Sequence, residues 1–315
     1  MDINLISLIL LTLFSGCIAG ILAGLLGVGG GIVVVPLLYY VLNYLNYDQS
    51  IIMHVAVGSS LLIIVPTSIR SAIQHRKRGS FDQDVFRKWI PPLFLGTIIG
   101  AFFAVYATFE VLTSIFASIA TLVAIEMFLN RKTKKSKILP TKILFQISPI
   151  FIGLVSVMMG IGGGSLSVPI MNYSGIEMRK AVGTSAAFGT VIAIPGSIGF
   201  IIGGLGQTLL PPLSIGYVNL IAFGLIVPAT LLTVPIGVNF AHRISQNKLR
   251  KLFGLFLGIL LFPSPDFSKS ILIGALLPFN LFPQIISNYL LFWSFLIATL
   301  SPVVVIIGYD SFKRR

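Results

Sequence analysis

Two stretches of this sequence are near copies of each other: "GVGGGIVVVPLLYY" at residues 27–40 and "GIGGGSLSVPIMNY" at residues 160–173, with seven of the fourteen positions identical. Each copy places four glycines within five residues and then a proline, inside an apolar run. Glycine and proline at this density interrupt a continuous helix. We therefore predict that one short half-helix begins near Ile32 and another near Ser165.

The composition of the chain predicts an all-α integral membrane protein. Of the 315 residues, 56% are hydrophobic and 10% are charged, whereas soluble domains carry about 25% charged residues. Several apolar stretches reach or approach the roughly 20 residues that a helix needs to cross a bilayer. The opening "MDIN" has no basic residue, unlike a signal peptide, so the apolar run from Leu5 is expected to be a retained first helix. The single cysteine, Cys17, permits no internal disulfide.

Most of the basic residues behind the net charge of +13 lie in short segments between or after apolar ones, which argues against nucleic acid as a partner. Twenty of the 22 Lys and Arg residues lie in five groups between or after apolar segments. These groups fall at 75–88, 131–142, 179–180, 242–251 and 313–315. Basic loops face the cytoplasm in membrane proteins. We expect these loops on the cytoplasmic side of a bacterial inner membrane, with the N-terminus outside.

The repeated motif marks a longer internal repeat. "AVGSS" at 56–60 follows the first glycine motif, and "AVGTS" at 181–185 follows the second. Each half has five apolar segments, and equivalent loops alternate in charge. After the third segment, for example, "HRKRGSFDQDVFRK" is basic whereas "GGLGQTLLPP" is uncharged. This alternation predicts two inverted-topology repeats of about five helical segments each, an architecture typical of secondary transporters. The predicted division is 1–130 (first repeat), 131–142 (basic cytoplasmic linker), 143–262 (second repeat) and 263–315 (divergent hydrophobic tail).

The segments themselves are expected at the following positions. In the first half they are 4–26, 32–44, 49–74, 89–107 and 111–130. In the second half they are 143–160, 165–174, 180–203, 214–240 and 252–262.

A half-helix that starts inside the membrane is a ready binding site for an anion. Its first amides have no helical acceptor, and its N-terminus is the positive end of the helix dipole. The residues expected to bind a small anion are the loop glycines and the nearby hydroxyls: Gly29, Gly30, Gly31, Gly162, Gly163, Gly164, Ser165, Ser59, Ser60, Thr184 and Ser185. Two other interpretations remain open: the glycines serve close helix packing, and the hydroxyls bond to carbonyls of their own helix.

Other uses of a glycine-rich loop do not fit. A P-loop needs GK[ST] after its glycines, and neither copy has it. The dinucleotide pattern GxGxxG fails at Ile32 and Ser165. No His/Asp/Glu cluster suggests a metal and no nucleophile–base pair suggests hydrolysis, so we expect no enzyme activity, cofactor or metal. His54, beside "AVGSS", is either a group that titrates during transport or an interfacial histidine.

The doubled GxGGGxxxVP, each copy followed by AVG[ST]S, resembles the TauE/SafE sulfite exporter family. The run "LPPLSIGYVNLIAFGLIVPATLLTVPIGVNFAHRISQNKLRKLFGLFLGIL" at 210–260 is similar to that family too. The resemblance covers about residues 5–260, and the chain departs from the pattern after residue 260. It implies transport of small sulfur- or carbon-containing oxyanions across the bilayer. We expect a secondary transporter of sulfite, organosulfonates or related organic acids, and keep a passive anion channel and a non-transport membrane assembly subunit as alternatives.

Overall fold

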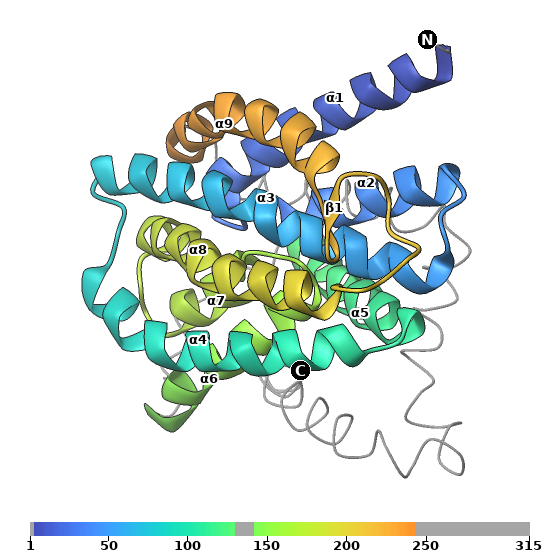
Figure 1. The fold of residues 1–315 in the computed structure, drawn as a ribbon. Coiled ribbons are helices and arrows are strands. Elements are labelled where there is room, and N and C mark those ends of the chain that lie inside the picture. Colours follow the sequence, from blue (N-terminus) through green and yellow to red (C-terminus); the bar gives the residue numbers. More distant parts are fainter. Residues whose placement is uncertain (1–2, 130–141, 244–315) are drawn as a thin grey trace. The chain divides into compact units, whose positions relative to one another are not determined.

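The computed structural model describes residues 3–129 and 142–243, which are almost entirely helical (Figure 1). In the first half the helices are α1 (Ile3–Leu26), α2 (Gly31–Tyr44), α3 (Gln49–Lys77), α4 (Gln83–Tyr106) and α5 (Phe109–Leu129). In the second half the elements are α6 (Lys142–Met158), α7 (Gly164–Tyr173), α8 (Met178–Gly203), β1 (Ser214–Ile215), β2 (Val218–Asn219) and α9 (Leu220–Arg243). Most of the predicted linker 131–142, the segment 252–262 and the tail 263–315 lie outside the described residues.

The two short helices begin where the glycine motifs predict. α2 starts at Gly31 and α7 at Gly164, each one residue before its expected start. The residue before each helix, Gly30 or Gly163, has a positive φ of 79° or 73°, and neither helix has a side-chain cap. Only glycine adopts this left-handed conformation without a steric cost. The motif therefore sets the first residue of both helices.

The segment predicted from residue 214 begins with a hairpin instead of a helix. β1 pairs antiparallel with β2, and α9 starts only at Leu220. Gly216, with a φ of 54°, supplies the turn. The Asn219 side chain then caps α9, because its Oδ1 accepts a 2.9 Å hydrogen bond from the Ala222 amide. Turn and cap residues thus outweigh the apolar character of this stretch.

The long helices pack in a matched arrangement. α1 packs against α9, α4 packs against α6, and α3 packs against α8 (Figure 1). The short α2 lies on α3, and the short α7 lies on α8. α3 is the most buried of the long helices, so it forms the centre of the core together with α8.

Glycines allow the paired helices to approach closely. A Cβ atom built on Gly20 of α1 would lie 2.6 Å from the Thr230 carbonyl oxygen of α9, and one on Gly24 would lie 2.7 Å from the Val238 nitrogen. Gly96 and Gly100 of α4 are equally close to the backbone of α6. Small residues at helix contacts are the usual way for membrane helices to associate, and the glycine series of α1 has this packing role.

Five of the described helices are long and apolar enough to cross a membrane. They comprise Leu8–Leu26, Gln49–Lys77, Gln83–Tyr106, Met178–Gly203 and Leu220–Arg243. Large apolar side chains such as Phe102 and Leu232 are exposed, at 62% and 75%, whereas many Ser and Thr side chains are buried. An apolar exterior around a hydroxyl-rich interior suits a protein surrounded by lipid.

We expect Gly24→Ala to destabilise the protein, because the added methyl group meets the backbone of α9 and overpacking costs about 1–3 kcal/mol. The measurement is the melting temperature in detergent. Gly224→Ala is the matched control, since a Cβ atom at this exposed position of α9 has no atom within 4 Å. Equal melting temperatures for the two variants would contradict the close contact between α1 and α9.

Candidate functional site

The two glycine loops meet each other in the buried interior. The Gly162 amide donates a 3.1 Å hydrogen bond to the Val28 carbonyl of the opposite loop. A Cβ atom on Gly31 would meet the Gly160 carbonyl oxygen, and one on Gly164 would meet the Gly27 carbonyl oxygen. All the residues of both loops are buried. α2 and α7 therefore start from one shared point in the protein interior.

The loops have similar but not identical backbones. Gly27 and Gly160 both have a φ of 66°, but Gly29 has a positive φ of 74° whereas its counterpart Gly162 does not. In α2 the Gly30 carbonyl first accepts from the Val33 amide, and in α7 the Gly163 carbonyl first accepts from the Leu166 amide. The amides before these have no acceptor within their own helix. Together with the helix dipoles they form a positive region inside the protein.

Two of the predicted hydroxyls cross-link the halves reciprocally. Ser60 Oγ of α3 donates to the Gly160 carbonyl of the second loop at 2.8 Å. Ser185 Oγ of α8 lies 3.3 Å from the Gly27 carbonyl of the first loop and 2.9 Å from the Val182 carbonyl of its own helix. The serine that ends each AVG[ST]S motif thus reaches the glycine loop of the other half.

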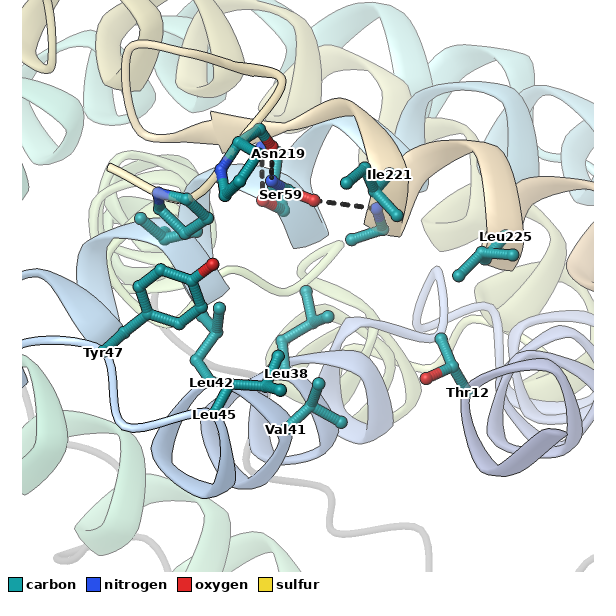
Figure 2. A pocket seen from close by; sticks show the side chains of 14 residues that line it. Thr12, Leu38, Val41, Leu42, Leu45, Tyr47, Ser59, Asn219, Ile221 and Leu225 are labelled. Carbon is teal, nitrogen blue, oxygen red and sulfur yellow. Dashed lines mark hydrogen bonds between the residues drawn. The ribbon is translucent and has the colours of Figure 1, made fainter. Parts of the chain in front are cut away.

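The other two predicted hydroxyls accept hydrogen bonds from helix caps. Ser59 Oγ accepts from the Asn219 amide at 2.8 Å, as Figure 2 shows, and Thr184 Oγ1 accepts from the Asp82 amide at 2.9 Å. Asp82 caps α4 as Asn219 caps α9, since its Oδ1 accepts from the Val85 amide at 3.1 Å. The first residue of each pair therefore holds the start of a long helix from the other half.

The structure brings the loop glycines, Ser60 and Ser185 together at the loop contact, whereas Ser59 and Thr184 bond to the capping residues of α9 and α4. Of the four paired hydroxyls, only Ser185 bonds to a carbonyl of its own helix. The fifth hydroxyl, Ser165, lies in the first turn of α7, where it is buried and has no hydrogen-bond partner. Their binding of an anion stays a prediction.

Residues 12–262 match the sequence model of the sulfite exporter TauE/SafE family. The chain belongs to this family. A probable membrane transporter protein of Haemophilus influenzae is 37% identical over 253 residues, which cover 79% of this chain and 95% of the relative. One of Methanocaldococcus jannaschii is 26% identical over 274 residues, covering 82% and 96%. No solved structure matches the chain.

Family membership and the apolar helices identify a multi-pass membrane protein. The names of the relatives indicate a membrane transporter and not an enzyme. In this TauE/SafE family member, no group of three His, Cys, Asp or Glu side chains among the described residues is placed to hold a metal ion.

An apolar cavity of about 120 Å³ lies beside Ser59 (Figure 2). Its walls come from α1, α2, α3, the start of α9 and the segment before β1. Figure 2 shows Leu38 and Leu42 of α2, with Leu45 just after its end, on one side and Asn219 with Ile221 on another. The only hydroxyls that line it are those of Thr12, Tyr47 and Ser59, so its chemistry favours an apolar group over an anion.

Two histidines lie in the interior at different places along α3. His54 is buried with no hydrogen-bond partner on either ring nitrogen, 4.8 Å from the Tyr217 ring. Burial raises the pKa of the Tyr217 hydroxyl. His75 Nε2 lies 2.8 Å from the Gly24 carbonyl oxygen, and its ring is 6.1 Å from that of His242. His54 and His75 thus lie in different surroundings, beside the hairpin residue Tyr217 in one case and beside α1 in the other.

Three further buried hydroxyls were not predicted from the sequence. Ser68, Ser156 and Ser167 are buried and have no hydrogen-bond partner. Ser167 stands inside the quoted glycine motif, but Ser68 and Ser156 lie in ordinary helical stretches. Their neighbours come from distant segments, so local sequence gave no signal for them.

We expect Thr184→Val to lower the free energy of unfolding by about 1 kcal/mol, because the Asp82 amide loses its acceptor. Thr184→Ser keeps a hydroxyl oxygen at this position and is the matched control. Unfolding in detergent, followed by circular dichroism, measures both. If the two variants were equally stable, the hydroxyl would not be holding the start of α4.

Proposed function

We propose that this TauE/SafE family member is a secondary transporter that carries small oxyanions across the inner membrane by alternating access. The proposed substrates are sulfite, organosulfonates or related organic acids. The family carries the description sulfite exporter, and the relatives are named probable membrane transporter proteins. We further propose that the N-terminus lies outside and that the basic loops face the cytoplasm, because of the charge pattern of the loops.

The observation that carries the proposal is the buried meeting point of α2 and α7. Both helices present their first amides there, in a region where no described Lys or Arg is buried. Helix N-termini attract anions through unpaired N–H groups and the dipole. Irregular backbone at membrane depth occurs where it is buried in protein or lines a cavity. These conditions favour an anion site at the glycine loops over packing alone.

We also propose that the two halves are inverted repeats. Exchange of the halves turns the α1–α9 pair into the α6–α4 pair, and both pairs are packed. The same exchange turns the Ser60–Gly160 hydrogen bond into the Ser185–Gly27 hydrogen bond. These matched contacts support a pseudo-two-fold relation, which in transporters lies in the membrane plane. Transport would then come from one repeat rocking about the other.

Counterflow tests the transport mechanism. Proteoliposomes are loaded with unlabelled sulfite, sulfoacetate or a short carboxylate, and uptake of the labelled anion is followed. A carrier gives a transient overshoot, because it exchanges internal for external anion, whereas a passive channel gives equilibration without overshoot. Protein-free liposomes are the control. Absence of flux for every anion would favour the alternative of an assembly subunit.

Single cysteines test the inverted topology in a Cys17→Ser background. We expect an impermeant maleimide added outside cells to label Gln49→Cys and Thr208→Cys. Lys77→Cys and Glu177→Cys should react only after permeabilisation. All four positions are exposed at loops or helix ends. Labelling of Gln49→Cys and Glu177→Cys from the same side would contradict inversion, because they follow equivalent helices.

A further inference from the structure

Four serine hydroxyls in the described part of the chain are buried and have no hydrogen-bond partner. They are Ser68, Ser156, Ser165 and Ser167, each at most 4% exposed. Most buried polar groups in proteins are hydrogen-bonded, and an unpaired one costs about 1–3 kcal/mol. A serine in a helix usually avoids this cost by bonding to a carbonyl one turn earlier, as Ser197 does with Ile194 at 3.0 Å.

Two of the four hydroxyls lie beside the starts of the short helices. A Cβ atom on Gly29, just before α2, would lie 3.1 Å from Ser68 Oγ. A Cβ atom on Gly163, which caps α7, would lie 3.4 Å from Ser156 Oγ. Each half-helix start therefore has one unpaired hydroxyl next to it, from α3 in one case and from α6 in the other.

Ser68 also lies near the second loop. Gly189 of α8 faces it closely, and a Cβ atom on Gly189 would lie 3.6 Å from the Gly162 carbonyl oxygen. Because Gly189 has no side chain, Ser68 Oγ stands at the contact of the two loops. Its hydroxyl hydrogen is available to an acceptor held there.

Ser165 and Ser167 lie on α7 itself. Ser165 is the second residue of the helix, where its own amide has no acceptor within the helix. The aligned positions of the first motif are Ile32 and Val34, which carry no hydroxyl. The starts of α2 and α7 therefore differ in side-chain chemistry although each follows a left-handed glycine.

The two kinds of hydroxyl divide by symmetry. Ser59 and Ser60 have counterparts in Thr184 and Ser185, and all four bond to backbone groups of the protein. Counted from the same motifs, Ser68 corresponds to Ala193 and Ser156 to Ala23. The four serines without a hydrogen-bond partner thus also lack a hydroxyl at the equivalent position of the other half.

We infer that Ser68 and Ser156, together with Ser165 on α7, donate hydrogen bonds to the oxygens of an oxyanion held between the two glycine loops. This inference rests on the proposed transport function and names its ligand donors. The hydroxyls of the two AVG[ST]S motifs hold the halves together, and the serines without a hydrogen-bond partner bind the ligand. The donors are neutral, and no Lys or Arg of the described residues is buried with them.

Ser68→Ala and Ser156→Ala test this assignment by counterflow with labelled sulfite or sulfoacetate. A hydrogen bond to a charged group contributes enough that its loss weakens binding about tenfold or more. Each variant should raise the half-saturating anion concentration about tenfold. Ser197→Ala is the matched control, since it removes a buried serine hydroxyl that is already bonded within α8, and its half-saturation should equal that of the wild type.

The melting temperature without anion separates a ligand role from a structural one. Because the Ser68 and Ser156 hydroxyls have no protein partner, their removal should leave this temperature unchanged or raise it. The stabilisation by added sulfite should shrink in both variants and persist in Ser197→Ala. A lowered melting temperature with unchanged half-saturation would overturn the assignment.

The transport outcomes distinguish the two levels of the proposal. Wild-type counterflow with unchanged half-saturation in both serine variants would overturn the ligand assignment and leave the transport function standing. Absence of wild-type flux for every anion would overturn the transport function and the assignment with it.

Discussion

The backbone contact between the two glycine loops is the constraint on which the rest of the structure depends. Two irregular segments meet inside an apolar chain, where an unpaired peptide group is costly. The contact pairs some of these peptide groups itself, through the hydrogen bond from the Gly162 amide to the Val28 carbonyl. Ser60 and Ser185 of α3 and α8 pair two further loop carbonyls. Side chains at Gly31 or Gly164 would push the loops apart, so the glycines are needed for packing whatever else they do.

The close contact of the glycine loops requires that the surrounding helices also pack closely. Within lipid the hydrophobic effect does not drive helices together, so contact between helices depends on van der Waals packing and hydrogen bonds. α1 and α4 use glycines to lie directly against the backbones of α9 and α6. These two pairs flank α3 and α8, whose hydroxyls then point to the loops and caps of the opposite half. The interior consequently holds many hydroxyls among its apolar side chains, and Phe, Leu and Ile side chains are also exposed on the exterior.

The sequence predicts the elements of this fold better than it predicts their partners. The starts of α2 and α7 were predictable within one residue, because the glycines act on the local backbone, whereas Pro36 and Pro169 lie inside the two helices. The hairpin before α9 was missed, since its apolar residues look like the helix that follows and Gly216 is a weak signal. The bonds of Ser59 and Ser60 could not be foreseen, because their acceptors and donors lie 160 and 100 residues away. Ser68 and Ser156 gave no signal at all, since only the folded chain shows that they lack a partner.

Under the proposed alternating access, the serines assigned to the ligand need no counterpart in the other half. A carrier works only when its two orientations are close in free energy, because a large gap leaves one of them unpopulated. Bonds that occur in equivalent pairs, such as Ser60–Gly160 and Ser185–Gly27, are exchanged when the halves exchange roles, and they favour neither orientation. A ligand donor is under no such restriction, since the same anion contacts it in both orientations. Ser68, Ser156 and Ser165 can therefore lie at positions that the other half fills with Ala or Ile. The proposed site can be asymmetric while the hydrogen bonds between the halves favour neither orientation.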